Sequence, residues 1–111
     1  MEPMDIYIAN VPFDERTGSK IRPALVIEVG QERVAVFKVT SQYQNKSDEI
    51  KKLYYPIKEW QQAGLKKQSY VDIHRLYRLS KKWIFSHQPI GKLTDIDRLS
   101  LFNFIKNIEH K

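Results

Sequence analysis

The 111-residue chain has no cysteine, only four glycines, and no apolar run that approaches the ~20 residues needed to cross a bilayer. Without cysteine, a disulfide framework, a thiolate nucleophile and a zinc–thiolate site are all excluded. The first residues also lack a basic segment followed by a long apolar core, so we expect no signal peptide. Together these absences favour a reducing cytosol, and we expect a cytoplasmic protein with no membrane partner.

Acidic residues are in the minority: the formal net charge is +6 and the sequence pI is about 9.6. A basic balance favours polyanionic partners, either nucleic acid or an acidic protein, although it also keeps a small domain soluble. The three histidines have no metal-ligand spacing, and no carboxylate pair matches a two-metal nuclease. We therefore expect neither a metal nor a cofactor.

The length predicts a single domain over residues 1–111, and the hydrophobic pattern predicts a mostly β fold with a terminal helix. Polar loops are expected over residues 13–21 and 43–52, and a short helix over residues 58–63 that ends at Gly64. The alternation slips near His74 and Arg75, which predicts a β-bulge. Strands are expected over residues 5–11, 25–29, 33–40, 53–57, 69–73 and 76–79.

The final segment is predicted to be a helix that is capped by Thr94, with Asp97 three residues later as its capping-box partner. It carries more apolar surface than one covered face needs. One apolar stripe is expected to pack on the sheet and the other to meet a second subunit, which predicts a homodimer. The two stripes are Ile96, Leu99, Phe102 and Ile105, and Leu101, Phe104 and Ile108.

Two apolar runs, joined by a turn at Gly30 and Gln31, predict a β-hairpin. If they pair antiparallel, the start of one lies beside the end of the other, so Arg22 and Thr40 come close together. A guanidinium beside a hydroxyl suits a phosphate group. Lys38 has the same strand parity as Thr40, and both are expected to point out of the core.

Five short segments follow one another in a recognisable order. They are Asp5-Ile6-Tyr7, Arg22-Pro23-Ala24-Leu25-Val26-Ile27, Val39-Thr40-Ser41-Gln42, Trp60 to Leu65 with Ser69-Tyr70-Val71, and Ile90-Gly91-Lys92-Leu93 followed by a helix. In this order they resemble the MazF/PemK family of toxins from type II toxin–antitoxin systems, which are small ribosome-independent endoribonucleases. The strongest signature is the Arg-Pro pair followed by an apolar run.

The resemblance implies an SH3-like, MazF-type small β-barrel with a C-terminal helix and a short internal helix. It also implies metal-independent cleavage of single-stranded RNA by attack of the ribose 2′-OH, a homodimer, and inhibition by an acidic antitoxin. Arg22 and Thr40 match the family's catalytic arginine and threonine. His74 is the third catalytic candidate, although either Asp72 or His74 could occupy the place of an acidic residue of some family members.

Further residues are expected to contact RNA because they flank this pair on the sequence or share its strands. Tyr43 could stack on a base, since it follows the Thr-Ser-Gln corner on a polar loop. The loop before Arg22 lacks a glycine that the family usually has, which leaves base specificity open. The alternative function is a non-catalytic SH3-like module that binds nucleic acid or another protein. The RNA-contact candidates are Ser19, Lys20, Lys38, Ser41, Gln42 and Tyr43.

Overall fold

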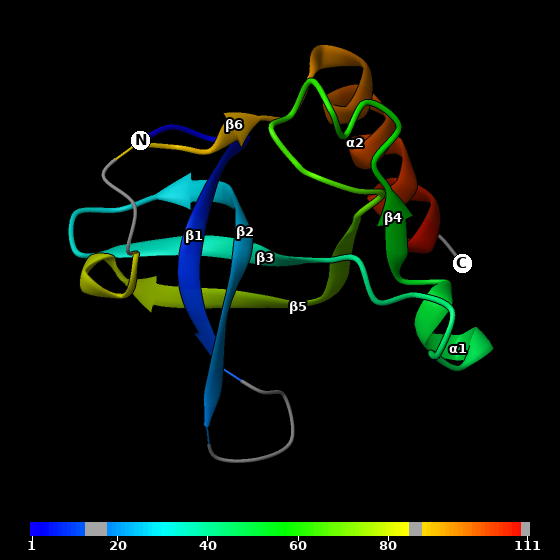
Figure 1. Cartoon of the computed structure of the whole chain (residues 1–111), viewed down its shortest axis with the longest axis horizontal. Coiled ribbons are helices and arrows are strands. Elements are labelled where there is room, and N and C mark those ends of the chain that lie inside the picture. The colour runs from blue at the N-terminus through cyan, green and yellow to red at the C-terminus, as the bar shows by residue number, and fades with distance from the viewer. Residues whose placement is uncertain (13–17, 85–87, 110–111) are drawn as a thin grey trace.

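The computed structural model describes residues 1–12, 18–84 and 88–109. Within them, strands predominate and a long helix ends the chain (Figure 1). In chain order the elements are β1 (Asp5–Pro12), β2 (Ser19–Val29), β3 (Arg33–Thr40), α1 (Asp48–Lys51), β4 (Tyr54–Pro56), β5 (Tyr70–Ser80), the 3-10 helix η1 (Lys81–Trp83), β6 (Gly91–Lys92) and α2 (Asp95–Glu109). No helix among these is long and apolar enough to span a membrane.

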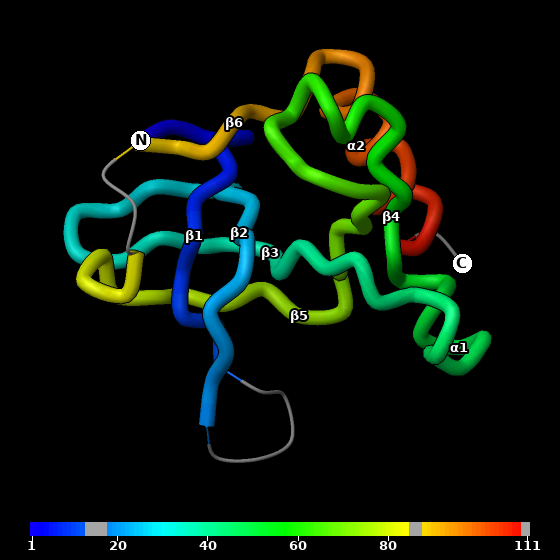
Figure 2. Tube along the Cα trace, in the orientation of Figure 1, coloured from blue at the N-terminus to red at the C-terminus, as the bar shows by residue number. Residues whose placement is uncertain are grey.

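The six strands form one antiparallel sheet in the order β4-β5-β3-β2-β1-β6. The sheet curls strongly, so that β1 crosses in front of β3 and β5, and α2 lies at the opposite end from the β2–β3 turn (Figures 1 and 2). This half-barrel with a C-terminal helix confirms the predicted mostly β fold.

The curl gives the sheet two apolar cores, one on each side. The first lies between the sheet and α2 and includes Ile6, Leu25 and Leu101, none of them exposed. The second lies inside the curl and includes Val26 and Val36. Successive residues of a strand point to opposite faces, so a strand that serves both cores is apolar at consecutive positions. This explains the unbroken apolar runs that the sequence places in β2 and β3.

A β-bulge lies where the sequence predicts one. The β3–β5 register moves from Phe37 opposite Leu76 to Lys38 opposite Asp72, which leaves three residues of β5 without a direct partner. β5 is nevertheless one continuous strand, so the two predicted strands are parts of the same element. The bulge re-aims the side chains at its centre, His74 among them.

Three local predictions are wrong. β2 begins at Ser19, so the predicted loop over residues 13–21 is shorter than expected, and residues 13–17 lie outside the described part. The polar segment 43–52 contains α1, whose N-cap Ser47 accepts a hydrogen bond from the Ile50 amide. The predicted helix over residues 58–63 is instead a series of turns. The short internal helix is therefore α1. Residues 58–64, which we call the turn segment, end at Gly64, whose φ is +89°.

Asp97 joins that turn segment to α2. Its buried carboxylate accepts hydrogen bonds from the Tyr55 hydroxyl (2.5 Å), the Lys58 amide (2.9 Å) and the Glu59 amide (2.8 Å). Burial, followed by the bond to Asp97, raises the pKa of Tyr55, so its hydroxyl stays protonated as a donor. The Asp97 amide donates to the Thr94 hydroxyl over 3.4 Å, which confirms Thr94 as the cap of α2, whereas the contacts of the Asp97 carboxylate are with Tyr55, Lys58 and Glu59.

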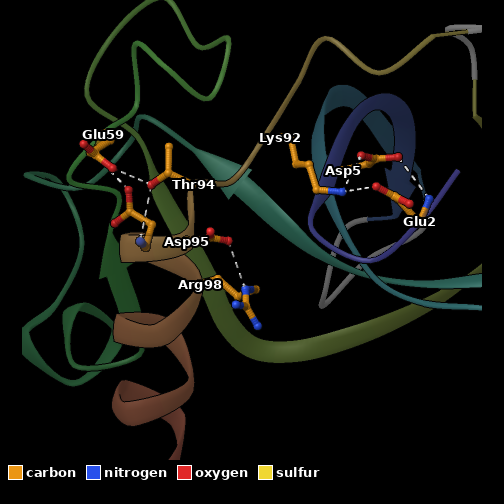
Figure 3. A network of polar contacts seen from close by, with 8 residues as sticks. Glu2, Asp5, Glu59, Lys92, Thr94, Asp95 and Arg98 are labelled. Atoms are coloured by element: carbon orange, nitrogen blue, oxygen red, sulfur yellow. Dashed lines mark hydrogen bonds and ion pairs between the residues drawn. The ribbon is translucent and has the colours of Figure 1, made fainter.

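Polar contacts also hold β6 and the start of α2 against neighbouring segments (Figure 3). Lys92 of β6 pairs with Glu2 and lies 3.7 Å from the Asp5 carboxylate. At the start of α2, the Thr94 hydroxyl donates to Glu59 over 2.6 Å. The segment from β6 to α2 is thus held at both the N-terminal residues and the turn segment.

The last helix divides its apolar residues between the core and solvent. Leu101 is fully buried, and Phe104 packs edge-on against the Tyr55 ring at 5.6 Å between centroids. Of the other predicted stripe, only Ile105 packs against the core. Its remaining members are more than half exposed, namely Ile96 at 57%, Leu99 at 57% and Phe102 at 51%.

The turn segment and β6 approach each other so closely that only glycine fits at positions 64 and 91. A Cβ on Gly91 would lie 1.8 Å from the Ala63 carbonyl oxygen. We expect Gly91→Ala to lower the free energy of unfolding by about 3 kcal/mol, because backbone must move to admit the methyl group. Urea denaturation measures this loss. Gly30→Ala is the control, since its Cβ meets only the Arg33 carbonyl oxygen, at 3.0 Å. Equal stability of the two variants would contradict the close approach.

Candidate active site

A row of side chains crosses the face of the sheet that holds the second core. Strand pairing places Ala9 opposite Arg22 and Thr40 opposite Tyr70. The last β2–β3 pair is Ala24 opposite Lys38, two residues after Arg22 on β2 and two residues before Thr40 on β3. Directly opposite residues point to the same face. Residues two apart on a strand share a face, so Arg22, Thr40 and Tyr70 lie on one face of the sheet, and we call them the arginine row.

Arg22 carries an unusual polar atom. Its Nε is buried and has no hydrogen-bond partner among the described residues, although the side chain as a whole is half-buried. A buried donor without an acceptor costs about 1–3 kcal/mol, and more when it is charged. Such an atom is retained where a ligand supplies the acceptor. The arginine row therefore has the character of an anion site.

Thr40 ends β3, and its hydroxyl oxygen accepts a hydrogen bond from the Gln42 amide at 3.0 Å. The oxygen is thereby held in place, while its own proton remains to be donated. Thr40 and Ser41 also line a pocket of about 460 Å³ with Lys66 and Lys67. Thr40 and Ser41 thus share a pocket with two lysines that were not predicted as site residues, although their adjacent position after Gly64 is visible in the sequence.

The neighbouring row on the same face contains Lys38 and Asp72. The Lys38 ammonium lies 3.2 Å from the Asp72 carboxylate, and the two side chains are only 15% and 6% exposed. The expectation that Lys38 points freely out of the core is therefore wrong, because the Asp72 carboxylate holds it inside. The other Asp72 oxygen accepts the His74 amide at 2.9 Å. Of the two proton-transfer candidates, Asp72 is buried in an ion pair and His74 is exposed.

The remaining candidates lie around the two rows. Ser19 and Lys20 are exposed at the start of β2, and Gln42 is exposed after Thr40. The Tyr43 ring stacks on Tyr70 with centroids 4.3 Å apart. The Nζ atom of Lys51 also lies 5.1 Å from the centroid of the Tyr43 ring. Tyr43 thus packs on the arginine row within the chain itself, and its stacking on a base stays a prediction, as do the RNA contacts of the other residues.

The two rows, together with His74, which follows Asp72 by two residues, provide groups that suit a phosphodiester. A guanidinium neutralises charge on phosphate oxygens and donates along two parallel directions. A hydroxyl with a fixed oxygen positions one of those oxygens, and an imidazole can carry a proton near neutral pH. Residues 1–12, 18–84 and 88–109 contain no group of three or more His, Cys, Asp or Glu residues placed to hold a metal ion.

Comparison with known proteins identifies the class of protein to which this half-barrel with a terminal helix belongs. A family model described as "PemK-like, MazF-like toxin of type II toxin-antitoxin system" matches residues 2–107. The fold is similar to that of the Mycobacterium tuberculosis toxin MazF-mt6, with a TM-score of 0.67, 20% identity and 93% of each chain covered. No curated protein sequence matches the chain. The chain belongs to the MazF/PemK-like family of type II toxins.

Proposed function

We propose that this toxin is a metal-independent endoribonuclease that cuts single-stranded RNA. The ribose 2′-oxygen forms a bond to the adjacent phosphorus, and the bond from phosphorus to the 5′-oxygen breaks. The 2′-hydroxyl loses its proton and the 5′-oxygen gains one. The products are a 2′,3′-cyclic phosphate and a 5′-hydroxyl. The observation that carries this proposal is the buried Arg22 Nε, which has no partner among the described residues, on the same face of the sheet as Thr40.

Arg22, Thr40, His74 and Lys38 each have a separate task in this reaction. Arg22 stabilises the extra negative charge of the phosphorane, which exists only near the transition state. The Thr40 hydroxyl donates a hydrogen bond to a phosphate oxygen and so positions it. His74, exposed in the bulge of β5, transfers a proton. Lys38, paired with Asp72, adds positive charge beside the arginine row.

An RNA strand and a DNA strand of the same mixed sequence test the proposal against its rivals. In the presence of a chelator, we expect the purified protein to cut the RNA and leave the DNA intact, because DNA lacks the 2′-hydroxyl. A non-catalytic nucleic-acid-binding module would bind both strands and cut neither. A protein-interaction module would show no salt-dependent RNA binding.

The proposal includes an acidic antitoxin as the natural inhibitor. A protein with a net charge of +6 attracts an acidic polypeptide over long range, and such a partner would cover the same rows that bind RNA. We place this complex in the cytoplasm, where its RNA substrate is found. Addition of the acidic partner is expected to stop RNA cleavage and to compete with RNA binding.

It also includes a homodimer through the exposed face of α2. Leu99 and Phe102 lie at its centre, with Asp95 before them and Lys106 after them at helical spacing. When two such helices pack antiparallel around a two-fold axis, Asp95 of each meets Lys106 of the other. The face is thus complementary to itself in both charge and hydrophobicity.

We expect Leu99→Asp to convert the dimer into a folded monomer, because it places a charge at the centre of the apolar face without touching the core. Light scattering at several concentrations measures the mass. Ile50→Asp, at an apolar residue 42% exposed on α1, should leave the dimer intact. Leu101 is unsuitable for this test, since its side chain is buried in its own core. A monomeric wild type at all concentrations would refute the dimer.

A further inference from the structure

A second basic pocket lies outside the arginine row. It has a volume of about 700 Å³ and is lined by residues from the β1–β2 hairpin, the β3 and β5 strands and η1. Arg33, Arg78 and Lys82 contribute three cations and Glu32 one carboxylate, which gives a formal charge of +2. None of the three cations makes an ion pair within the described ranges.

The same pocket contains a large aromatic surface. Trp83 lines it and is 43% exposed, although tryptophan is usually well buried. Strand pairing fixes the arginines, because Arg33 lies opposite Ser80 and Arg78 precedes Ser80 by two residues on the same face. An exposed indole beside cations on rigid strands matches the combination that binds single-stranded nucleic acids: a stacked base and a neutralised backbone.

We infer that this pocket, which we call the Trp83 pocket, binds one nucleotide of a single-stranded nucleic acid, with its base on Trp83 and its phosphate near Arg33 and Arg78. The inference rests on the proposed RNA substrate. Ser19, the first residue of β2, lines the pocket and lies three residues before Arg22, about 10 Å along the strand and on its opposite face.

An acidic peptide is a weaker fit for this pocket. Its carboxylates would use the cations, but the half-exposed indole would contribute little to it. A nucleotide uses both the ring and the charges. The Trp83 pocket thus favours nucleic acid over the antitoxin as its occupant.

Binding of a labelled single-stranded DNA of mixed sequence tests this inference without any cleavage, because DNA has no 2′-hydroxyl. A stacked base contributes about 1–3 kcal/mol, so Trp83→Ala should weaken binding about 5- to 150-fold. Trp83→Phe should retain most of the affinity, since a flat ring remains. The double variant Arg33→Ala/Arg78→Ala should reduce the slope of log K against log salt by about 0.7 for each phosphate that the protein no longer neutralises.

Arg98→Ala, on α2, is the matched control and should bind like the wild type. Thermal denaturation of each variant checks that the fold is kept. Unchanged affinity and salt slope in the Trp83 and arginine variants would overturn the inference. Weaker binding of an acidic peptide together with unchanged binding of DNA would assign the pocket to a protein partner and also overturn it. Weakened DNA binding in a protein that cuts no RNA would support the pocket while contradicting the proposed nuclease.

Discussion

Replacing Arg22 with alanine should lower the rate of RNA cleavage about 100-fold or more while the protein stays folded. The guanidinium faces charge that develops only in the transition state, and removal of one such donor has effects of this size. Arg22→Lys should also lose most activity, because an ammonium cannot donate along two parallel directions. Initial rates on a long transcript of mixed sequence measure both variants.

Stability separates a functional Arg22 from a structural one. Its buried Nε has no acceptor among the described residues, so the alanine variant loses an uncompensated donor. We expect its melting temperature to equal or exceed that of the wild type, as occurs where a site sacrifices stability for function. Arg98→Ala is the activity control. A variant at Arg22 that is both fully active and destabilised would make the residue structural.

Replacing Asp97 with alanine should have the largest effect on stability, with a loss of about 3 kcal/mol or more in the free energy of unfolding. The substitution leaves the Tyr55 hydroxyl and the amides of Lys58 and Glu59 without their acceptor. The turn segment would then lose its attachment to α2. Urea denaturation followed by circular dichroism measures the loss.

Two variants define how much of this effect comes from the carboxylate. Asp95→Ala removes a carboxylate from the same turn of the helix. Because the Asp95 side chain is 91% exposed, this variant should change the free energy of unfolding by no more than about 0.5 kcal/mol. Tyr55→Phe removes only one donor and should cost about 1 kcal/mol. If Asp97→Ala were as stable as Asp95→Ala, the proposed attachment would be wrong.

The sequence predicts those features that depend on local pattern. The slip in alternation near His74 gives the bulge of β5 because a bulge adds residues to only one strand. The β2–β3 hairpin follows from its turn alone, and its last pair, Ala24 with Lys38, lies two residues from Arg22 and two from Thr40. The mostly β class follows from the same alternation.

Other features depend on contacts between distant segments. Residues 58–63 favour a helix by composition, but six residues are too few to nucleate one alone, and Asp97 instead fixes their first amides. The burial of Lys38 depends on which residue of β5 lies opposite, and the bulge decides that it is Asp72. The Trp83 pocket unites the β1–β2 hairpin with η1, which no local pattern can reveal.

The chemistry of the RNA ends produced in the presence of a chelator tests the central claim most directly. After a cleavage site has been mapped in a long transcript, a short RNA containing it is incubated with the wild-type protein, and the product masses are measured. We predict a 2′,3′-cyclic phosphate on one fragment and a 5′-hydroxyl on the other, with no cleavage when the nucleotide 5′ of the cut carries a 2′-deoxy sugar. Fragments with a 5′-phosphate, or cleavage that requires magnesium, would contradict it.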